Sequence, residues 1–144
     1  MRSKIAFVLL LAVFALSGMS QEVSAATPLR LSLLPGISIP GDNVVIGIDI
    51  GLIADSVQEV NGFQVSWLYS GTDRLSGIQL GLVNISNSAT GIQWGLYNQS
   101  QSFVGIQIGL INVTDTMHGF QIGLINIIRT GAPFPFMVFI NGNF

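Results

Sequence analysis

One eight-residue phrase recurs six times in this chain of 144 residues. The phrase reads glycine, apolar, glutamine, apolar, glycine, leucine, apolar, asparagine in its clearest copies, and successive copies start 15, 15, 14, 14 and 14 residues apart. The six copies start at Gly47, Gly62, Gly77, Gly91, Gly105 and Gly119. Self-similarity at a fixed period is the signature of stacked repeats, so the repeat limits the possible folds more than any other feature.

Each copy carries a two-residue alternation that changes phase twice. With the first glycine as position 1, positions 2, 4 and 6 are apolar, as Ile106, Ile108 and Leu110 illustrate. This alternation predicts a strand with one buried face, so we expect these positions in the core. Apolar residues then shift to positions 7 and 9, and shift again to the residue two before the next glycine, such as Met117. A strand that keeps one face inward changes phase only at a bend or bulge.

Two phase changes in each copy predict an all-β fold, a β-solenoid of about six repeats of 14–15 residues with capping segments. One copy would run along one sheet, turn near position 7, return along a second sheet and turn again at the glycine. Equivalent positions would stack about 4.8 Å apart on successive coils. The glycine at position 1 is expected at a corner with positive φ, and the glycine at position 5 is expected to face outward as part of a flat surface.

The N-terminal residues have the pattern of a secretory signal peptide. Arg2 and Lys4 precede an apolar run from residue 5 to residue 16, and Val23 and Ala25 form a small-x-small cleavage pattern. The chain contains no cysteine, which excludes a disulfide framework. We therefore divide the chain into a signal peptide (1–25), an N-terminal cap segment (26–46), a six-repeat β-domain (47–130) and a C-terminal cap or closing strand (131–144).

An eight-stranded outer-membrane β-barrel is the alternative fold. The C-terminal segment alternates apolar residues at Phe136, Val138 and Ile140 and ends in Phe144, which is similar to the closing strand of such barrels. Two flanking strands and six repeats would make eight strands, with apolar positions toward lipid. The phase change within each repeat and the uniformly short loops favour the solenoid.

Stacking would align the amide side chains of successive copies in two rows. The glutamine row is Gln64, Gln79, Gln93, Gln107 and Gln121, and the asparagine row is Asn84, Asn98, Asn112 and Asn126. Amides stacked in register can donate to one neighbour and accept from the other. We interpret both rows as structural ladders, and a polar binding strip is the alternative.

The remaining residues offer little chemistry, and we expect no catalytic, metal-binding or cofactor-binding residue and no enzymatic activity. The only histidine, His118, lies near Asp115, which is too few ligands for a metal site. Asp49 and Asp55 have no basic residue near them in the sequence. Trp67 and Trp94 occupy apolar positions and are expected in the core. After residue 25 the chain has three arginines, no lysine and six acidic residues, so nucleic acid binding is not expected.

The repeats at 77–84, 105–112 and 119–126, with the flanks Leu31-Ser-Leu-Leu-Pro35 and Pro135-Phe-Met, resemble a group of bacterial surface repeat-containing proteins. The likeness covers nearly all of the chain after residue 25. The group has no established activity that the resemblance could imply. From the signal peptide and the repeats we expect an exported bacterial protein with a structural or interaction role at the cell envelope, on the cell surface, in the outer membrane or in the periplasm. The outer membrane, other envelope proteins and further copies of the chain are the partners that this leaves open. In the barrel alternative the protein would be a membrane anchor or a narrow pore.

Overall fold

The computed structural model describes residues 26–144, and the predicted signal peptide lies outside the described residues. Within this range every regular element is a β-strand. The strands are β1 (Thr27–Leu34), β2 (Ile37–Ile39), β3 (Val44–Gly51), β4 (Ala54–Ser66), β5 (Tyr69–Leu80), β6 (Val83–Trp94), β7 (Tyr97–Ile108), β8 (Ile111–Thr130) and β9 (Phe136–Asn143). Among these described residues there is no long apolar helix that could cross a membrane.

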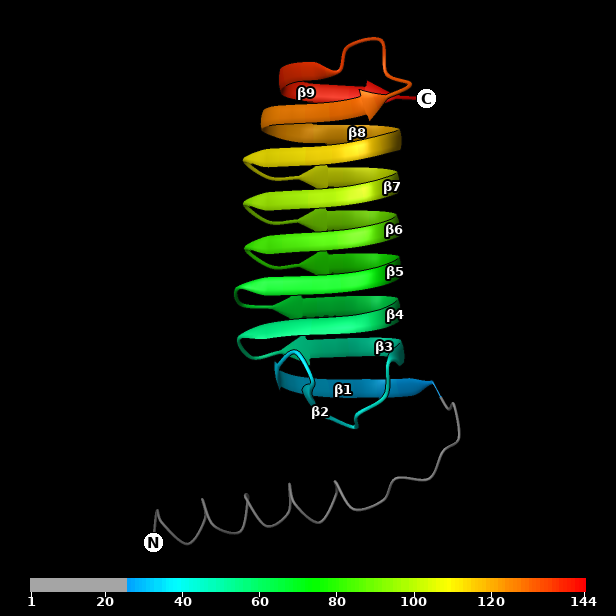
Figure 1. The fold of residues 1–144 in the computed structure, drawn as a ribbon, viewed down its shortest axis with the longest axis vertical. Helices are drawn as coiled ribbons and strands as arrows, with labels where there is room; N and C mark the ends of the chain where they lie inside the picture. The colour runs from blue at the N-terminus through cyan, green and yellow to red at the C-terminus, as the bar shows by residue number, and fades with distance from the viewer. Residues whose placement is uncertain (1–25) are drawn as a thin grey trace, which may run out of the picture.

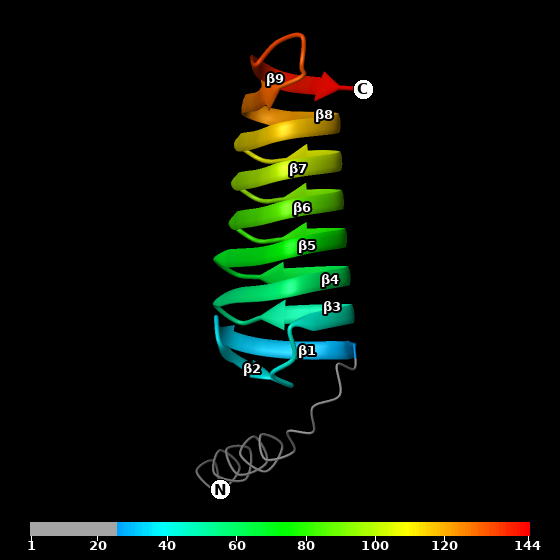
Figure 2. The ribbon, with the colours of Figure 1, turned by 45° about the vertical axis from the view of Figure 1, so that its right-hand side comes forward.

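The strands form a β-solenoid of about seven turns, which confirms the predicted fold class. From β3 to β8 each strand pairs in parallel with the next, so Gly77 lies beside Gly91 and Gln79 beside Gln93. The coils rise along one axis from β1 to β9 (Figures 1 and 2). β1 also pairs in parallel with β3 and adds a turn below the six repeats. The antiparallel meander of the alternative fold does not occur between the repeats.

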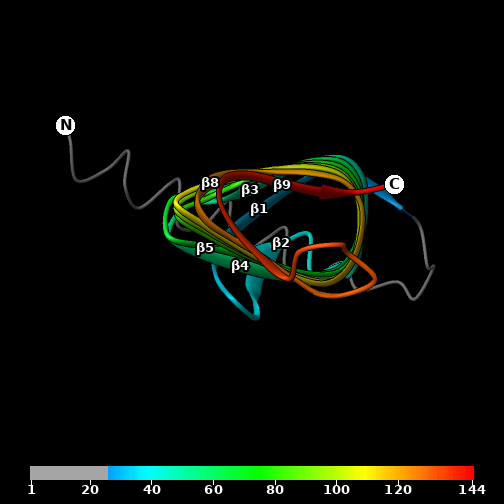
Figure 3. The ribbon, with the colours of Figure 1, turned by 90° about the horizontal axis from the view of Figure 1, so that it is seen from above.

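Each coil is a flattened oval when the molecule is viewed along its axis (Figure 3). We call positions 1–4 the first side, positions 5–7 the tight turn, positions 8–11 the second side and positions 12–14 the wide bend. In the coil from Gly91 to Val104, Gly95 and Leu96 form the tight turn between β6 and β7. The wide bend lies inside β7, because each long strand passes around it without a break. In the two 15-residue copies the tight turn holds one extra residue.

The glycine at position 1 lies at a corner with positive φ, as predicted. The six glycines at this position have φ between 130° and 141°. A Cβ atom on Gly91 would overlap the carbonyl oxygen of Gly77 on the coil below, and the neighbouring copies repeat this contact. Only glycine combines this φ with so close an approach of two backbones.

The prediction for the core is wrong, because positions 2, 4 and 6 face outward. Trp94 is 61% exposed and Trp67 is 78% exposed, although both were expected inside. Within the repeats the main apolar row inside the coils is the one two residues before each glycine: Val60, Leu75, Ala89, Phe103 and Met117. A two-residue alternation looks the same when a strand is turned over, so the pattern alone does not say which face is inside.

The glycine at position 5 does not form a flat outward surface, which corrects a second prediction. A Cβ atom on Gly95 would lie 2.6 Å from the Nδ2 atom of Asn84, and one on Gly109 would lie 2.6 Å from the Nδ2 atom of Asn98. The missing side chain therefore leaves room for the asparagine row beneath the tight turn.

The two ends of the stack are covered by antiparallel strands. β2 pairs with β1 at the N-terminal end, and β9 runs back along β8 so that Ile140 lies opposite Ile122. Figure 1 shows β9 lying across the last coil. Antiparallel covering strands occupy the backbone groups of an open sheet edge, which would otherwise pair with other chains.

Candidate functional site

The glutamine row forms a continuous hydrogen-bonded ladder inside the coils. Each Nε2 group except that of Gln64 donates to the Oε1 atom of the glutamine one coil below, at 2.7 Å from Gln93 to Gln79 and 2.9 Å from Gln121 to Gln107. The same bond joins Gln79 to Gln64 and Gln107 to Gln93. All five side chains are completely buried. The ladder therefore has one direction, with its N–H groups pointing toward the N-terminal end.

Hydroxyl groups from the second side complete the bonding of this ladder. Ser100 donates to the Oε1 atom of Gln93 at 2.9 Å, and Thr114 donates to that of Gln107 at 2.7 Å. Gln121 in turn donates to the Oγ1 atom of Thr114 at 3.1 Å. Position 3 and position 10 thus meet across the interior and hold the two sides together. A polar interior is stable only when its donors and acceptors are paired in this way.

The asparagine row forms a second ladder with the opposite direction. Asn84 donates to Asn98 at 2.8 Å, Asn98 to Asn112 at 2.8 Å and Asn112 to Asn126 at 2.9 Å. Asn84 also donates to the carbonyl oxygen of Trp94, the last residue before the tight turn, at 2.9 Å. All four side chains are completely buried, as are the five glutamines. The nine predicted residues are therefore out of reach of a ligand in solution, which is incompatible with a polar binding strip.

A buried ionic cluster lies at the N-terminal end of the glutamine ladder. The Nη1 atom of Arg30 donates to Asp55 at 2.8 Å and to Asp49 at 3.2 Å, and Gln64 donates to both carboxyl groups at 3.2 to 3.3 Å. Arg30 is 2% exposed and both aspartates are fully buried. Arg30 precedes the two aspartates by 19 and 25 residues, so a search for basic residues near them in the sequence does not detect this cluster. β1 pairs with β3 so that Arg30 lies beside Asp49, which occupies the glutamine position of its copy.

The two carboxyl groups of this cluster differ in pKa. Burial, together with a hydrogen bond to Asp55 and its negative charge, raises the pKa of Asp49 to about 8. Burial also acts to raise the pKa of Asp55, but the hydrogen bond from Asp49 and the charge of Arg30 lower it overall. At neutral pH Asp49 therefore keeps its proton, and the positive Arg30 is balanced by the negative Asp55.

Large apolar side chains cover the first side and the tight turn of the molecule. They are the exposed residues of positions 2, 4, 6 and 7, which we call the apolar face: Ile48, Phe63, Ile106, Phe120, Val65, Trp94, Ile122, Leu52, Trp67, Leu82, Leu96, Leu110, Leu124, Ile53, Leu68, Ile111 and Ile125. The charged pairs lie elsewhere, on the second side and the wide bend, where Arg74 contacts Glu59 at 3.0 Å and Arg129 contacts Asp115 at 2.7 Å. The cross-section is therefore amphipathic.

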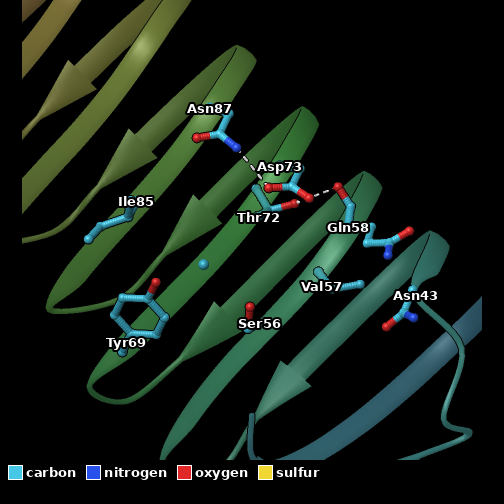
Figure 4. A pocket seen from close by; sticks show the side chains of 10 residues that line it. Asn43, Ser56, Val57, Gln58, Tyr69, Thr72, Asp73, Ile85 and Asn87 are labelled. Carbon is cyan, nitrogen blue, oxygen red and sulfur yellow. Dashed lines mark hydrogen bonds between the residues drawn. The ribbon is translucent and has the colours of Figure 1, made fainter. Parts of the chain in front are cut away.

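The second side carries a polar cavity of about 280 Å³ near the N-terminal end of the stack (Figure 4). Tyr69 and Ile85 line it toward the tight turn, and Gln58, Asp73 and Asn87 line it toward the wide bend. A second hollow of about 330 Å³ lies at the tight turn, on the apolar face, and is lined by leucines and Trp94.

Within residues 26–144 no three histidine, aspartate or glutamate side chains are grouped closely enough to hold a metal ion. His118 is exposed on the wide bend. No protein family, no curated protein and no solved structure is found to match the chain. The ladders, the apolar face and the polar cavity are therefore the features of the chain that bear on its function.

Proposed function

We propose that the chain is an exported structural scaffold of the bacterial cell envelope, without catalytic activity, that lies on a lipid surface through its apolar face. The observation that carries the proposal is the position of the apolar side chains outside a polar interior. Six coils about 4.8 Å apart make this face roughly 30 Å long, and its width of about five residues gives an area on the order of 500 Å². The largest apolar patch on a typical soluble monomer measures about 300–600 Å² and often has a function, and this face lies in that range.

The shape of the apolar face favours lipid over a protein partner. The face continues from the first side, at Phe63 and Ile106, around the tight turn to Leu96 and Ile111. A rigid protein partner would cover only one flat side of this curved face, whereas acyl chains can follow its curvature around the tight turn. Amphipathic elements that bind at a membrane surface bury their apolar side about 5–10 Å deep and leave their polar side in water. The charged wide bend would remain in water in this orientation.

The signal-peptide pattern and the resemblance to bacterial surface repeat-containing proteins support an envelope location. The purified protein is tested by flotation with vesicles of phosphatidylcholine. We expect it to float with the vesicles, and a Leu96→Asp and Leu110→Asp variant to show at least a tenfold lower partition coefficient. Each leucine contributes about 1.5–3 kcal/mol when it leaves water, and each aspartate adds a charge to be desolvated.

The matched control is Ser88→Asp with Ser102→Asp, which adds the same two charges at the exposed wide bend. This variant should float like the unchanged protein, and circular dichroism should show the same β-sheet content for all three proteins. Protein that stays in the aqueous fraction, or equal flotation of the leucine variant, would contradict the proposal. A stable dimer that protects the apolar face without vesicles would contradict it as well.

A further inference from the structure

Two tyrosines occupy the same row of the solenoid but have different surroundings. Tyr69 and Tyr97 both lie beside Val83, one on each neighbouring coil. The hydroxyl group of Tyr97 donates to the Oε1 atom of Gln99, two residues further along, at 2.8 Å. Two residues after Tyr69 the chain has Gly71, which has no side chain to accept such a bond.

The ring of Tyr69 lies over Gly71 and forms one wall of the polar cavity. A Cβ atom on Gly71 would be 2.7 Å from the Oη atom of Tyr69 and 2.8 Å from its Cε1 atom. The other residues of this row are Ser56 below and Ile85, Gln99 and Val113 above. The two small residues, Ser56 and Gly71, leave the hollow that larger side chains fill on the higher coils.

The opposite rim of the cavity carries two amide side chains, which donate and accept hydrogen bonds, and one carboxylate, which accepts them. Gln58, Asp73 and Asn87 lie in one row along this rim, and Asn87 donates to Asp73 at 2.8 Å (Figure 4). The lining includes the amide of Asn43 but neither arginine nor lysine. Amides and a carboxylate opposite an aromatic ring suit a neutral ligand that has hydroxyl groups on its edge and C–H groups on its face.

We infer that this cavity binds one ring of a neutral saccharide, which packs against Tyr69 while its hydroxyl groups bond to Gln58, Asp73 and Asn87. The volume of about 280 Å³ lies near the lower end of the range for small-molecule sites, about 300–1,000 Å³, and suits one sugar ring with its neighbours outside. The cavity belongs to the second side, away from the apolar face. The inference therefore goes beyond the proposed lipid association and does not depend on it.

Saturation-transfer NMR on the purified protein without lipid tests the site directly. The probes are neutral maltotriose, cellotriose and chitotriose, with the anionic trimer of galacturonic acid for comparison. We expect at least one neutral trimer to receive saturation, with a dissociation constant of millimolar order or tighter, and the anionic trimer to receive none. Absence of transfer to all three neutral trimers at 10 mM, or stronger transfer to the anionic trimer, would overturn the inference.

Two variants place the binding at the cavity. Tyr69→Ala removes the wall. Gly71→Ile displaces the ring of Tyr69 and occupies the hollow with the side chain that Ile85 already has in the same row. Each should weaken binding at least tenfold, and the coil should still form because this row accepts isoleucine on the next coil. Tyr97→Ala is the matched control and should bind like the unchanged protein. Equal loss in the Tyr97→Ala variant, or full binding by Gly71→Ile, would show that the cavity is not the site.

Discussion

The conformation of single glycines limits what each coil can accept. Gly91 has a φ of 130° and lies against the backbone of Gly77, so a side chain at this position meets strain and overlap together. We predict that Gly91→Ala lowers the free energy of unfolding by at least about 2 kcal/mol, measured by denaturant unfolding. Gly41→Ala is the control, because a Cβ atom there has no neighbour within 4 Å. If both variants unfold at the same denaturant concentration, the corner is not strained.

The buried ionic cluster predicts an unusual dependence of stability on pH. An exposed aspartate has a pKa of about 3.9, whereas that of Asp49 in the folded protein is about 8. Between these values the folded state holds a proton that the unfolded state has released. The free energy of unfolding should therefore fall as the pH rises from about 4 to 8, by on the order of 1 kcal/mol per pH unit. Asp55, with a lowered pKa, contributes stability that is lost as the pH falls below about 4.

Thermal unfolding of the Asp49→Asn variant at several pH values checks this prediction. The amide has the shape of the protonated carboxyl group and does not titrate, so the decline between pH 4 and 8 should disappear. Asp115→Asn changes an exposed aspartate paired with Arg129 and should keep the decline. A decline of equal slope in the Asp49→Asn variant would assign the pH dependence to other groups.

At the level of the element, the glutamine ladder should depend on each of its members. Gln107 accepts hydrogen bonds from Gln121 and Thr114, so removing its amide leaves buried groups without partners. We predict that Gln107→Leu lowers the free energy of unfolding by about 2–4 kcal/mol, although leucine is the more apolar residue. Gln101→Leu makes the same change at an exposed position and should alter stability by less than about 0.5 kcal/mol. Higher stability of Gln107→Leu in denaturant unfolding would show that the interior prefers apolar residues.

The repeat predicts the coil and its register, because copies of equal length bring equivalent residues side by side on successive coils. It does not predict which face is inside. Ile106 and Gln107 alternate equally well with either one buried, and the usual rule that apolar residues are inside selects Ile106. In the structure Gln107 is buried instead of Ile106, because its amide bonds to donors and acceptors of three neighbours. These bonds depend on the whole stack and not on one strand. The row of Met117 is the local feature of the sequence that indicates the buried face, since this row is apolar and lies where the chain bends.

The ionic cluster could be predicted only after the winding was known. Arg30 is 19 residues from Asp49 in sequence, a separation that differs from the repeat period because β1 precedes the first copy. The pairing of Arg30 with Asp49 depends on the register between β1 and β3. The repeat pattern does not predict this register, because β1 lies outside the repeats. The polar cavity has a similar origin, because it lies where Ser56 and Gly71 are smaller than the other residues of their row.

At the scale of the whole molecule, both ladders end within the stack and the sheet edges are covered. The Oε1 atom of Gln121 has no hydrogen-bond partner within the described residues, and neither has Oδ1 of Asn84 at the other end. Above Gln121, β9 pairs antiparallel with β8 and so presents a register that a further parallel coil cannot continue. Seven stacked turns without this strand would end in an open parallel edge, and such edges join to other chains.

We therefore predict that a protein lacking residues 133–144 assembles end to end. Its last coil would expose backbone N–H and C=O groups, together with the open acceptor of Gln121. These groups can pair with residues 27–30 of β1 in another molecule, the part of the N-terminal edge that β2 leaves unpaired. Light scattering after size exclusion should show a mass that grows with concentration and time, while the circular dichroism spectrum stays that of a β-sheet. Ile140→Pro should assemble in the same way but more slowly, because it removes only one backbone donor opposite Ile122. A shortened chain that remains monomeric would mean that β9 contributes stability but does not control assembly.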